Sequence, residues 1–204
     1  MPAPLIYLAS RSPRRQALLQ QLGVSFETLI LREAAGRDRD VVELPLDGEP
    51  AAHYVERIAR TKAQVGWQRM QNRGLAARPV LASDTEVVLD GVIFGKPHDA
   101  SDASAMLRKL AGRTHQVHTA VALRWQEQTE VEVVTSNVTM RALKPAEIKH
   151  YVAGGEPMDK AGGYAIQGVA AAFITRLDGS YSGVMGLPLA ETAALLAKAG
   201  FPVL

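Results

Sequence analysis

Residues 80–96 read VLASDTEVVLDGVIFGK, and this stretch constrains the fold more than any other part of the chain. Two β-favouring runs flank Asp90-Gly91, the strongest short-range signal for a two-residue β-hairpin. The sequence therefore predicts a hairpin of Val80–Leu89 and Val92–Lys96. Its spacing predicts three cross-strand pairs: Leu89 with Val92, Val87 with Phe94, and Thr85 with Lys96.

The same hairpin carries two acids, one residue apart. Regular alternation places Asp84 and Glu86 on one face of the strand, and Thr85 and Lys96 on the other. The turn returns Lys96 to the neighbourhood of Asp84. The two carboxylates could share a Mg²⁺ ion, or they could protect an exposed sheet edge by their charge. The second interpretation suits Glu86 better, because Asp84 directly follows an apolar run.

A strand and a helix are expected at the start of the chain. Leu5–Ala9 is a short β-favouring run, Ser12 is a good N-cap, and a helix is predicted over 13–22. Arg14 and Arg15 lie in its first turn, where positive charge opposes the helix dipole. Two interpretations stay open: both arginines are solvated, or the helix N-terminus and two guanidinium groups bind a phosphate.

A second cation interrupts an apolar pattern. Pro50 begins a predicted helix that runs to about Met70, and its apolar stripe includes Val55 and Ile58. Lys62 falls on the same inward face. Its stem could reach water from the rim of the core, or its ammonium group could face a cleft that holds an anion.

The remaining elements alternate between strands and helices. We therefore expect an α/β domain with a mixed sheet. The predicted strands cover Val24–Ile30, 114–126, 130–143 and Phe173–Leu177, the predicted helices cover 100–111, 145–153 and 188–199, and the irregular stretches are 31–48 and the glycine-rich 154–168.

Composition excludes several classes of protein. The chain has 204 residues, 47% of them hydrophobic, and shows no linker or repeat, so a single domain over 1–204 is expected. It has no cysteine, which excludes thiol nucleophiles and fits a cytoplasmic protein. The 23 Lys and Arg residues are interleaved with 21 acids, so no nucleic-acid surface is expected. No apolar run is long enough to predict a membrane helix.

Five segments of the chain, in order, resemble motifs of the Maf family of nucleoside triphosphate pyrophosphatases: LASRSPRRQALL, ARTKA, SDTEVVLDGVIFGKP, DKAGGYAIQG and GLPLAET. DKAGGYAIQG resembles the branch that acts on dTTP and UTP. The branch that acts on 7-methyl-GTP tends to carry Ser-Phe and a glutamate in that stretch. The resemblance implies a mixed, strongly twisted sheet flanked by helices, in two lobes around a central cleft.

The resemblance also implies roles for individual residues. Asp84 would be the catalytic base and a metal ligand, and Lys62 and Lys96 would assist catalysis. Members usually carry an acid pair in the loop after the second strand, where this chain reads LREAAGRDRD, and Glu33 is the nearest candidate for a metal ligand. The triphosphate would be surrounded by Ser12, Arg14, Arg15, Lys62 and Lys96, and substrate choice would involve Arg14, Thr85 and Gln167.

The activity expected from this resemblance is hydrolysis of dTTP and UTP, and of modified pyrimidine triphosphates, to the monophosphate and pyrophosphate. It would require a divalent cation, Mg²⁺ or Mn²⁺, and the protein would be a cytoplasmic homodimer without a nucleic-acid or membrane partner. One alternative is a pyrophosphatase for 7-methyl-GTP or purine triphosphates. The other is a regulator of cell division and septum formation that binds nucleotides without cutting them.

Overall fold

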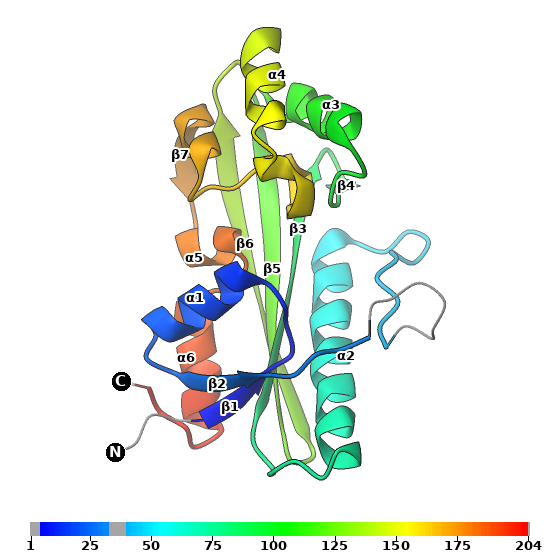
Figure 1. Ribbon diagram of the computed structural model, residues 1–204, viewed down its shortest axis with the longest axis vertical. Helices are drawn as coiled ribbons and strands as arrows, with labels where there is room; N and C mark the ends of the chain where they lie inside the picture. Colours follow the sequence, from blue (N-terminus) through cyan, green and yellow to red (C-terminus); the bar gives the residue numbers. More distant parts are fainter. Residues whose placement is uncertain (1–4, 33–39, 204) are drawn as a thin grey trace. The chain divides into compact units, whose positions relative to one another are not determined.

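A computed structural model describes residues 5–32 and 40–203. Its strands form a seven-stranded sheet in the order β2-β1-β3-β5-β6-β7, with β4 paired to β3 (Figure 1). β1 is parallel to β2 and β3, whereas the β3–β4 and β6–β7 pairs are antiparallel. The predicted α/β class with a mixed sheet is confirmed. The strands are β1 Leu5–Leu8, β2 Ser25–Thr28, β3 Val80–Leu89, β4 Val92–Phe94, β5 Thr114–Trp125, β6 Gln128–Met140 and β7 Ile174–Asp178.

The helices follow the predicted positions closely. The α-helices are α1 Pro13–Gln21, α2 Ala51–Asn72, α3 Ala100–Leu110, α4 Pro145–Ala153, α5 Tyr181–Met185 and α6 Leu189–Lys198. Three 3₁₀ helices occupy the glycine-rich region and its continuation: η1 Glu156–Asp159, η2 Ala161–Gly163 and η3 Val169–Phe173. The short helix α5 was not predicted, because five residues are too few to show a helical period. In the described part of the chain, no helix is both long and apolar enough to cross a membrane.

The chain divides into two compact units. Unit 1 comprises Met1–Asp84, Thr119–Val133 and Gly186–Leu204, and unit 2 comprises Thr85–His118 and Val134–Met185. The division falls within β3, β5 and β6, so each of these strands contributes a segment to each unit.

The predicted hairpin forms, but it is shorter than expected. Asp90 and Gly91 have φ values of 51° and 77°, as a type I′ turn requires, and Leu89–Val92 and Val87–Phe94 pair as predicted. The predicted Thr85–Lys96 pair is wrong, because β4 ends at Phe94.

Two features explain this early end. Pro97 has no N–H with which to continue a ladder, and the carbonyl of Gly95 accepts a hydrogen bond from the Gly162 N–H at 3.0 Å. β3 lies between β1 and β5 in the sheet, but β1 pairs with it at Val80 and Leu81 and β4 pairs with it at 87–89, so the edge-strand interpretation of Glu86 stays a prediction.

In unit 1, α2 packs closely against the sheet at a glycine. A Cβ atom on Gly66 would lie 2.8 Å from Val80 Cγ1 and 3.3 Å from Ala9 Cβ. Only glycine therefore allows this approach of the helix to β3. Both tryptophans of the chain lie in the same unit, where Trp125 makes edge-on contacts with Trp67 and Phe201.

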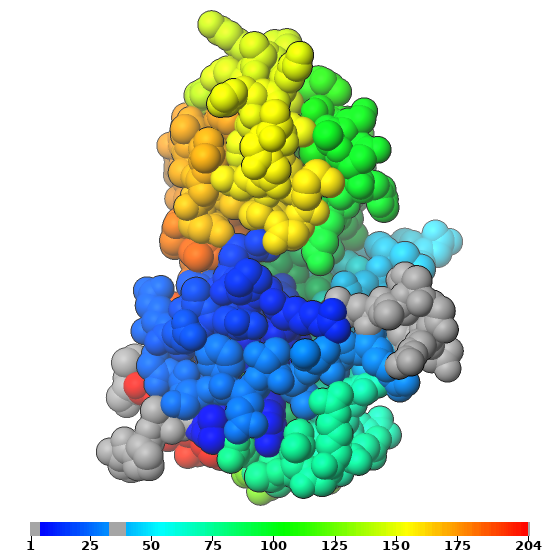
Figure 2. Space-filling view, viewed as in Figure 1, coloured from blue at the N-terminus to red at the C-terminus, as the bar shows by residue number. Residues whose placement is uncertain are grey.

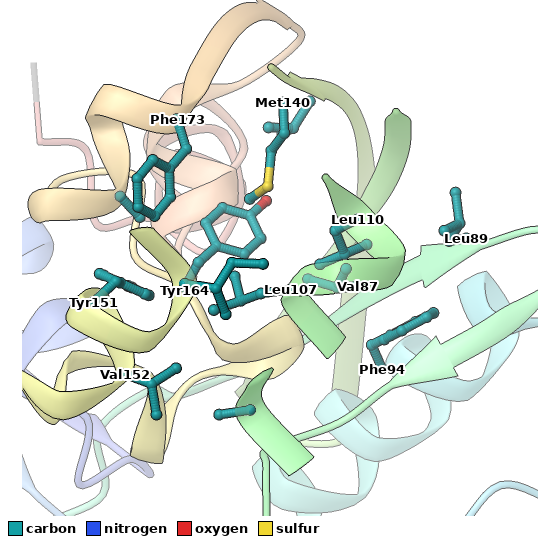
Figure 3. Packing of buried hydrophobic residues seen from close by; sticks show 14 of the residues in the cluster. Val87, Leu89, Phe94, Leu107, Leu110, Met140, Tyr151, Val152, Tyr164 and Phe173 are labelled. Atoms are coloured by element: carbon teal, nitrogen blue, oxygen red, sulfur yellow. The ribbon is translucent and has the colours of Figure 1, made fainter. Parts of the chain in front are cut away.

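The core of unit 2 is a cluster of buried side chains, most of which come from β3, β4, β5, β6, α3, α4 and η3 (Figure 3). Tyr164 lies among Phe173, Met140 and Leu107 in this cluster. Its hydroxyl is 2.7 Å from Nε2 of His115, which is 2% exposed. The imidazole of His115 therefore sits in an apolar environment that disfavours its charged form.

Unfolding experiments should reveal this buried histidine. Burial lowers the pKa of His115 to about 4, and burial also lowers the pKa of His118. Between pH 6.5 and 4 the unfolded chain binds a proton at His115 that the folded protein excludes, so stability falls as the pH falls. For His115 the expected loss is about 3 kcal/mol, measured by urea unfolding followed by circular dichroism.

The matched variant is His115→Gln, which keeps polar atoms at this position and does not titrate. Its free energy of unfolding should depend less on pH than that of the wild-type protein between pH 6.5 and 4. Identical pH dependence in both proteins would show that His115 already binds its proton in the folded state.

Candidate active site

The clearest polar feature of unit 1 is a buried ion pair between α2 and β3. The Nζ atom of Lys62 lies 2.8 Å from Oδ1 of Asp84, and the two side chains are 13% and 9% exposed. Of the two interpretations of Lys62, simple extension to bulk water is wrong, because its ammonium group is held by carboxylates. The pair joins two residues for which the resemblance to the Maf family implies catalytic roles.

The packing of α2 explains why these two side chains meet. Lys62 and Gly66 are four residues apart and share one face of the helix, while Val80 and Asp84 are four apart and share one face of the strand. The close contact of Gly66 with Val80 therefore brings Lys62, one helical turn away, to the part of β3 that carries Asp84. Four strand residues rise farther than four helix residues, and the long lysine stem spans the difference.

A second carboxylate, which the sequence did not single out, completes this cluster. Oε1 of Glu43 lies 2.7 Å from Lys62 Nζ, and the Glu43 side chain is 44% exposed. Two carboxylates and one ammonium group leave the cluster with a net negative charge. The signal for Glu43 was weak, since it stands between Val42 and Leu44 in a stretch predicted to be irregular.

Arginines of α2 hold the segment that carries Glu43. Nη2 of Arg57 donates to the Leu44 carbonyl at 3.0 Å, and the same guanidinium binds both carboxylate oxygens of Glu49 at 2.6 Å. Hydrogen bonding from Arg57 lowers the pKa of Glu49 to about 2. Arg69 forms an ion pair with Asp40 farther along the helix. These contacts place Glu43 beside Lys62.

The donor set is compatible with a divalent cation shared with a substrate. Oδ2 of Asp84 is buried and has no hydrogen-bond partner among the described residues. No group of three or more potential ligands from His, Cys, Asp or Glu occurs within 5–32 and 40–203. Mg²⁺ is commonly held by one or two carboxylates together with substrate phosphates, so Asp84 and Glu43 fit that pattern.

The α1 arginines are not simply solvated. Arg14 and Arg15 are both half-buried, and α1 forms part of the surface of unit 1 seen in Figure 2. Nε of Arg15 donates to the carbonyl of Gly186 at 2.8 Å. The hydroxyl of Ser83 donates to the same carbonyl, also at 2.8 Å. Gly186 thus links Arg15 to the residue that precedes Asp84.

Ser12 stands at the N-cap of α1 as predicted, but its side chain makes no capping hydrogen bond. There is also no acidic residue in the first turn of α1. The N-terminus of this helix therefore carries two arginines, and its dipole is not offset by an acid from its own first turn. This arrangement suits an anion from outside the helix.

Three predicted site residues belong to unit 2. Thr85 begins the unit and is half-buried, while Lys96 and Gln167 are exposed. The Gly162–Gly95 hydrogen bond joins the DKAGGYAIQG motif to the residue before Lys96.

The structure thus brings Lys62 into contact with Asp84, and it links Arg15 to β3. Glu33 lies outside the described residues, so its proposed role stays a prediction. The acid that the structure does place on the cluster is Glu43.

Comparison with known proteins decides the family. The model of the family described as "Maf-like protein" matches residues 5–199. The chain belongs to the Maf family. This family assignment agrees with the resemblance carried by the five sequence motifs.

Similar Maf family proteins match over almost their whole length. A protein of Nitrosomonas europaea is 56% identical over 97% of this chain and 96% of its own, and one of Aromatoleum aromaticum is 56% identical over 97% of each. Another, from Dechloromonas aromatica, is 50% identical over 96% and 98%. All three are named dTTP/UTP pyrophosphatase. Among solved structures, the Staphylococcus aureus Ham1 protein matches with a TM-score of 0.43 and 14% identity, over 67% of this chain and 71% of its own.

Proposed function

We propose that this Maf family protein hydrolyses dTTP and UTP to the monophosphate and pyrophosphate, and thereby removes pyrimidine triphosphates, including modified ones, from the nucleotide pool. The observation that carries the proposal is the buried Lys62–Asp84 pair, with one carboxylate oxygen of Asp84 unused by the described residues. The names of relatives that are 50–56% identical over nearly the whole chain support the choice of substrate.

In the proposed mechanism Asp84 acts as a general base. Its Oδ2 atom accepts a proton from water as the water oxygen attacks the α-phosphorus. The bond from the α-phosphorus to the bridging oxygen breaks, and pyrophosphate leaves with the bonding electrons. Lys62 holds the Asp84 carboxylate through Oδ1, which leaves Oδ2 for the water.

Cationic side chains would stabilise the charge of the triphosphate. We assign this role to Arg14, Arg15 and Lys96, with Ser12 as a hydrogen-bond donor at the start of α1. The Arg15–Gly186 hydrogen bond fixes the orientation of that guanidinium before any substrate binds. Thr85 and Gln167 are assigned to substrate choice.

A divalent cation, Mg²⁺ or Mn²⁺, is part of the proposal. Asp84 and Glu43 would hold it, because both are hard oxygen donors on one cluster with excess negative charge. Such an ion would supply charge neutralisation of the phosphates. We also propose a homodimer in the cytoplasm, and gel filtration tests the oligomeric state.

One assay tests the central claim. Purified protein is incubated with Mg²⁺ and a panel of nucleoside triphosphates, and pyrophosphate is measured as the first product. The proposal expects the highest kcat/KM for dTTP and UTP. Orthophosphate as the first product, preference for 7-methyl-GTP or a purine triphosphate, or no turnover at all would contradict it.

The recognition of the pyrimidine base can be tested at Gln167. Uracil and thymine present an N–H donor between two carbonyl acceptors, and a glutamine amide can both donate and accept. We expect Gln167→Glu to lower kcat/KM for dTTP and UTP, by a factor that corresponds to about 1–3 kcal/mol of transition-state stabilisation. The carboxylate lacks the N–H donor of the amide and repels the carbonyl oxygens of the pyrimidine. Steady-state kinetics with dTTP, UTP and 7-methyl-GTP provide the measurement.

The pattern across substrates separates two roles of Gln167. A role in base recognition predicts that discrimination shifts toward the cationic 7-methylguanine base. An equal loss for all triphosphates, or a lower melting temperature with unchanged kinetics, would show that Gln167 only supports the loop.

A further inference from the structure

Gln167 stands at an exposed turn whose preceding residues are buried. The Gly168 N–H donates to the Ala165 carbonyl at 3.0 Å, which closes a four-residue turn with Ile166 and Gln167 at its centre. Ala165 and Ile166 are 5% and 7% exposed, whereas Gln167 is exposed. The turn therefore exposes the Gln167 side chain, while the two residues before it anchor the turn in the protein interior.

Glu156 holds the chain immediately after this turn. Its Oε2 atom accepts a hydrogen bond from the Val169 N–H at 2.9 Å, and Oε1 accepts one from the Ala170 N–H at 3.3 Å. Oε1 also accepts the hydroxyl of Tyr151 at 2.9 Å. One carboxylate therefore satisfies the first N–H groups of η3, which would otherwise lack partners within the helix.

Close packing strengthens this attachment. A Cβ atom on Gly168 would overlap the carboxylate of Glu156, so the carboxylate lies directly against the glycine that ends the turn. Tyr151, which donates to the same carboxylate, is buried in the core of unit 2 (Figure 3). Glu156 consequently ties the residues after Gln167 to that core.

The residues before the turn have their own attachment. Tyr164 is buried in the same core, and its hydroxyl is bound to His115. The two attachments enclose a short segment, and Gln167 is its exposed residue. Of these two attachments, only the one made by Glu156 is a hydrogen bond to the backbone directly beside the turn.

We infer that Glu156 is a positioning residue for substrate choice: it fixes the turn that carries Gln167, so that the Gln167 amide meets the pyrimidine base in one orientation. This inference rests on the proposed function, because it takes Gln167 as the group that recognises the base. Glu156 itself needs no contact with substrate. Its contribution should appear as discrimination between bases rather than as the rate of phosphate chemistry.

The test compares Glu156→Gln with the wild-type protein. A glutamine amide has only one acceptor oxygen. Its NH₂ group would therefore face an N–H or O–H donor that bonds to the second carboxylate oxygen in the wild-type protein. The ratio of kcat/KM for dTTP to kcat/KM for GTP should fall about tenfold. Glu156→Asp, whose carboxylate is too short to keep all three contacts, should lower the ratio in the same direction if the amide variant fails to fold.

Glu147→Gln is the matched control. Glu147 lies in the same unit and also accepts a backbone N–H, from Lys144 at 2.8 Å, together with Arg141 at 2.7 Å. It does not contact the turn through any of these bonds. The control should lose stability but retain the substrate ratio.

A double-mutant cycle tests whether Glu156 acts through Gln167. In a Gln167→Ala background, Glu156→Gln should cause no further fall in the dTTP/GTP ratio. Additive effects, or an unchanged ratio in Glu156→Gln alone, would overturn the inference while leaving the proposed function intact.

Failure of the proposed function would be recognised in the wild-type protein, as a lack of pyrimidine preference. In that case amide hydrogen exchange still decides whether Glu156 holds the turn. Exchange over residues 165–170 should rise in Glu156→Gln and not in Glu147→Gln. Equal exchange in the two variants would overturn the positioning role by itself.

Discussion

Replacing Asp84 with asparagine is expected to reduce kcat about 10²–10⁴-fold, the usual contribution of a general base. The amide keeps the size of the side chain but cannot accept the proton of the attacking water. Substrate binding should largely survive, because Lys62 retains Glu43 as a partner at 2.7 Å and the cationic side chains assigned to the triphosphate are unchanged. Steady-state kinetics with dTTP give kcat, and equilibrium binding of dTTP to the variant gives the affinity.

Asp90→Asn is the matched control for this variant. Asp90 lies on the same hairpin, is exposed and pairs with Arg113, and asparagine tolerates its φ of 51°. The control should keep wild-type turnover and thermal stability. Near-wild-type turnover in Asp84→Asn would exclude Asp84 as the base.

Lys62→Met is expected to have the second large effect, a fall in kcat/KM for dTTP of about 10²-fold, the usual cost when a catalytic group loses its orientation. Methionine keeps most of the apolar stem but removes the ammonium group. Asp84, whose side chain is 9% exposed, would then face Glu43 without the cation that separates the two carboxylates. The Asp84 carboxylate should lose its fixed orientation, and Glu43 its attachment to α2.

Arg60→Met removes a positive charge from the same helix and serves as the control. Arg60 pairs with Glu56 at 2.8 Å and donates to the Thr129 carbonyl at 3.0 Å, away from the Asp84 cluster. Its kcat/KM should stay within a few-fold of the wild-type value, since pairs this exposed contribute little. A Lys62→Met protein with unchanged kcat/KM would remove the ion pair from the mechanism.

Much of the local structure followed from rules that act over a few residues. Asp90-Gly91 predicted the hairpin because both turn positions need positive φ, and these residues tolerate it at low cost. The start of α1 was equally readable from Ser12 and Pro13. The error at Lys96 also has a local cause, because Pro97 cannot continue the ladder that simple counting extends.

The candidate site was predicted less completely. Asp84 and Lys62 were recognisable because each breaks an apolar pattern, and the structure joins them in a buried pair. Glu43 breaks no regular pattern, since it lies in an irregular segment that arginines of α2 hold in place. Glu156 was missed for a similar reason: two of the three groups that donate hydrogen bonds to its carboxylate are backbone N–H groups, which carry no sequence signal.

By itself, the sequence determined the turn chemistry, the helix starts, the apolar periodicity and the motifs of the Maf family, because each of these depends on neighbours along the chain. Tertiary structure alone decided which partners the charged groups have. Lys62 and Asp84 are 22 positions apart, and Arg15 reaches the Gly186 carbonyl across 171 positions. Such contacts depend on how closely α2 approaches β3 at Gly66 and on where α1 meets Gly186, and packing of the folded chain sets both.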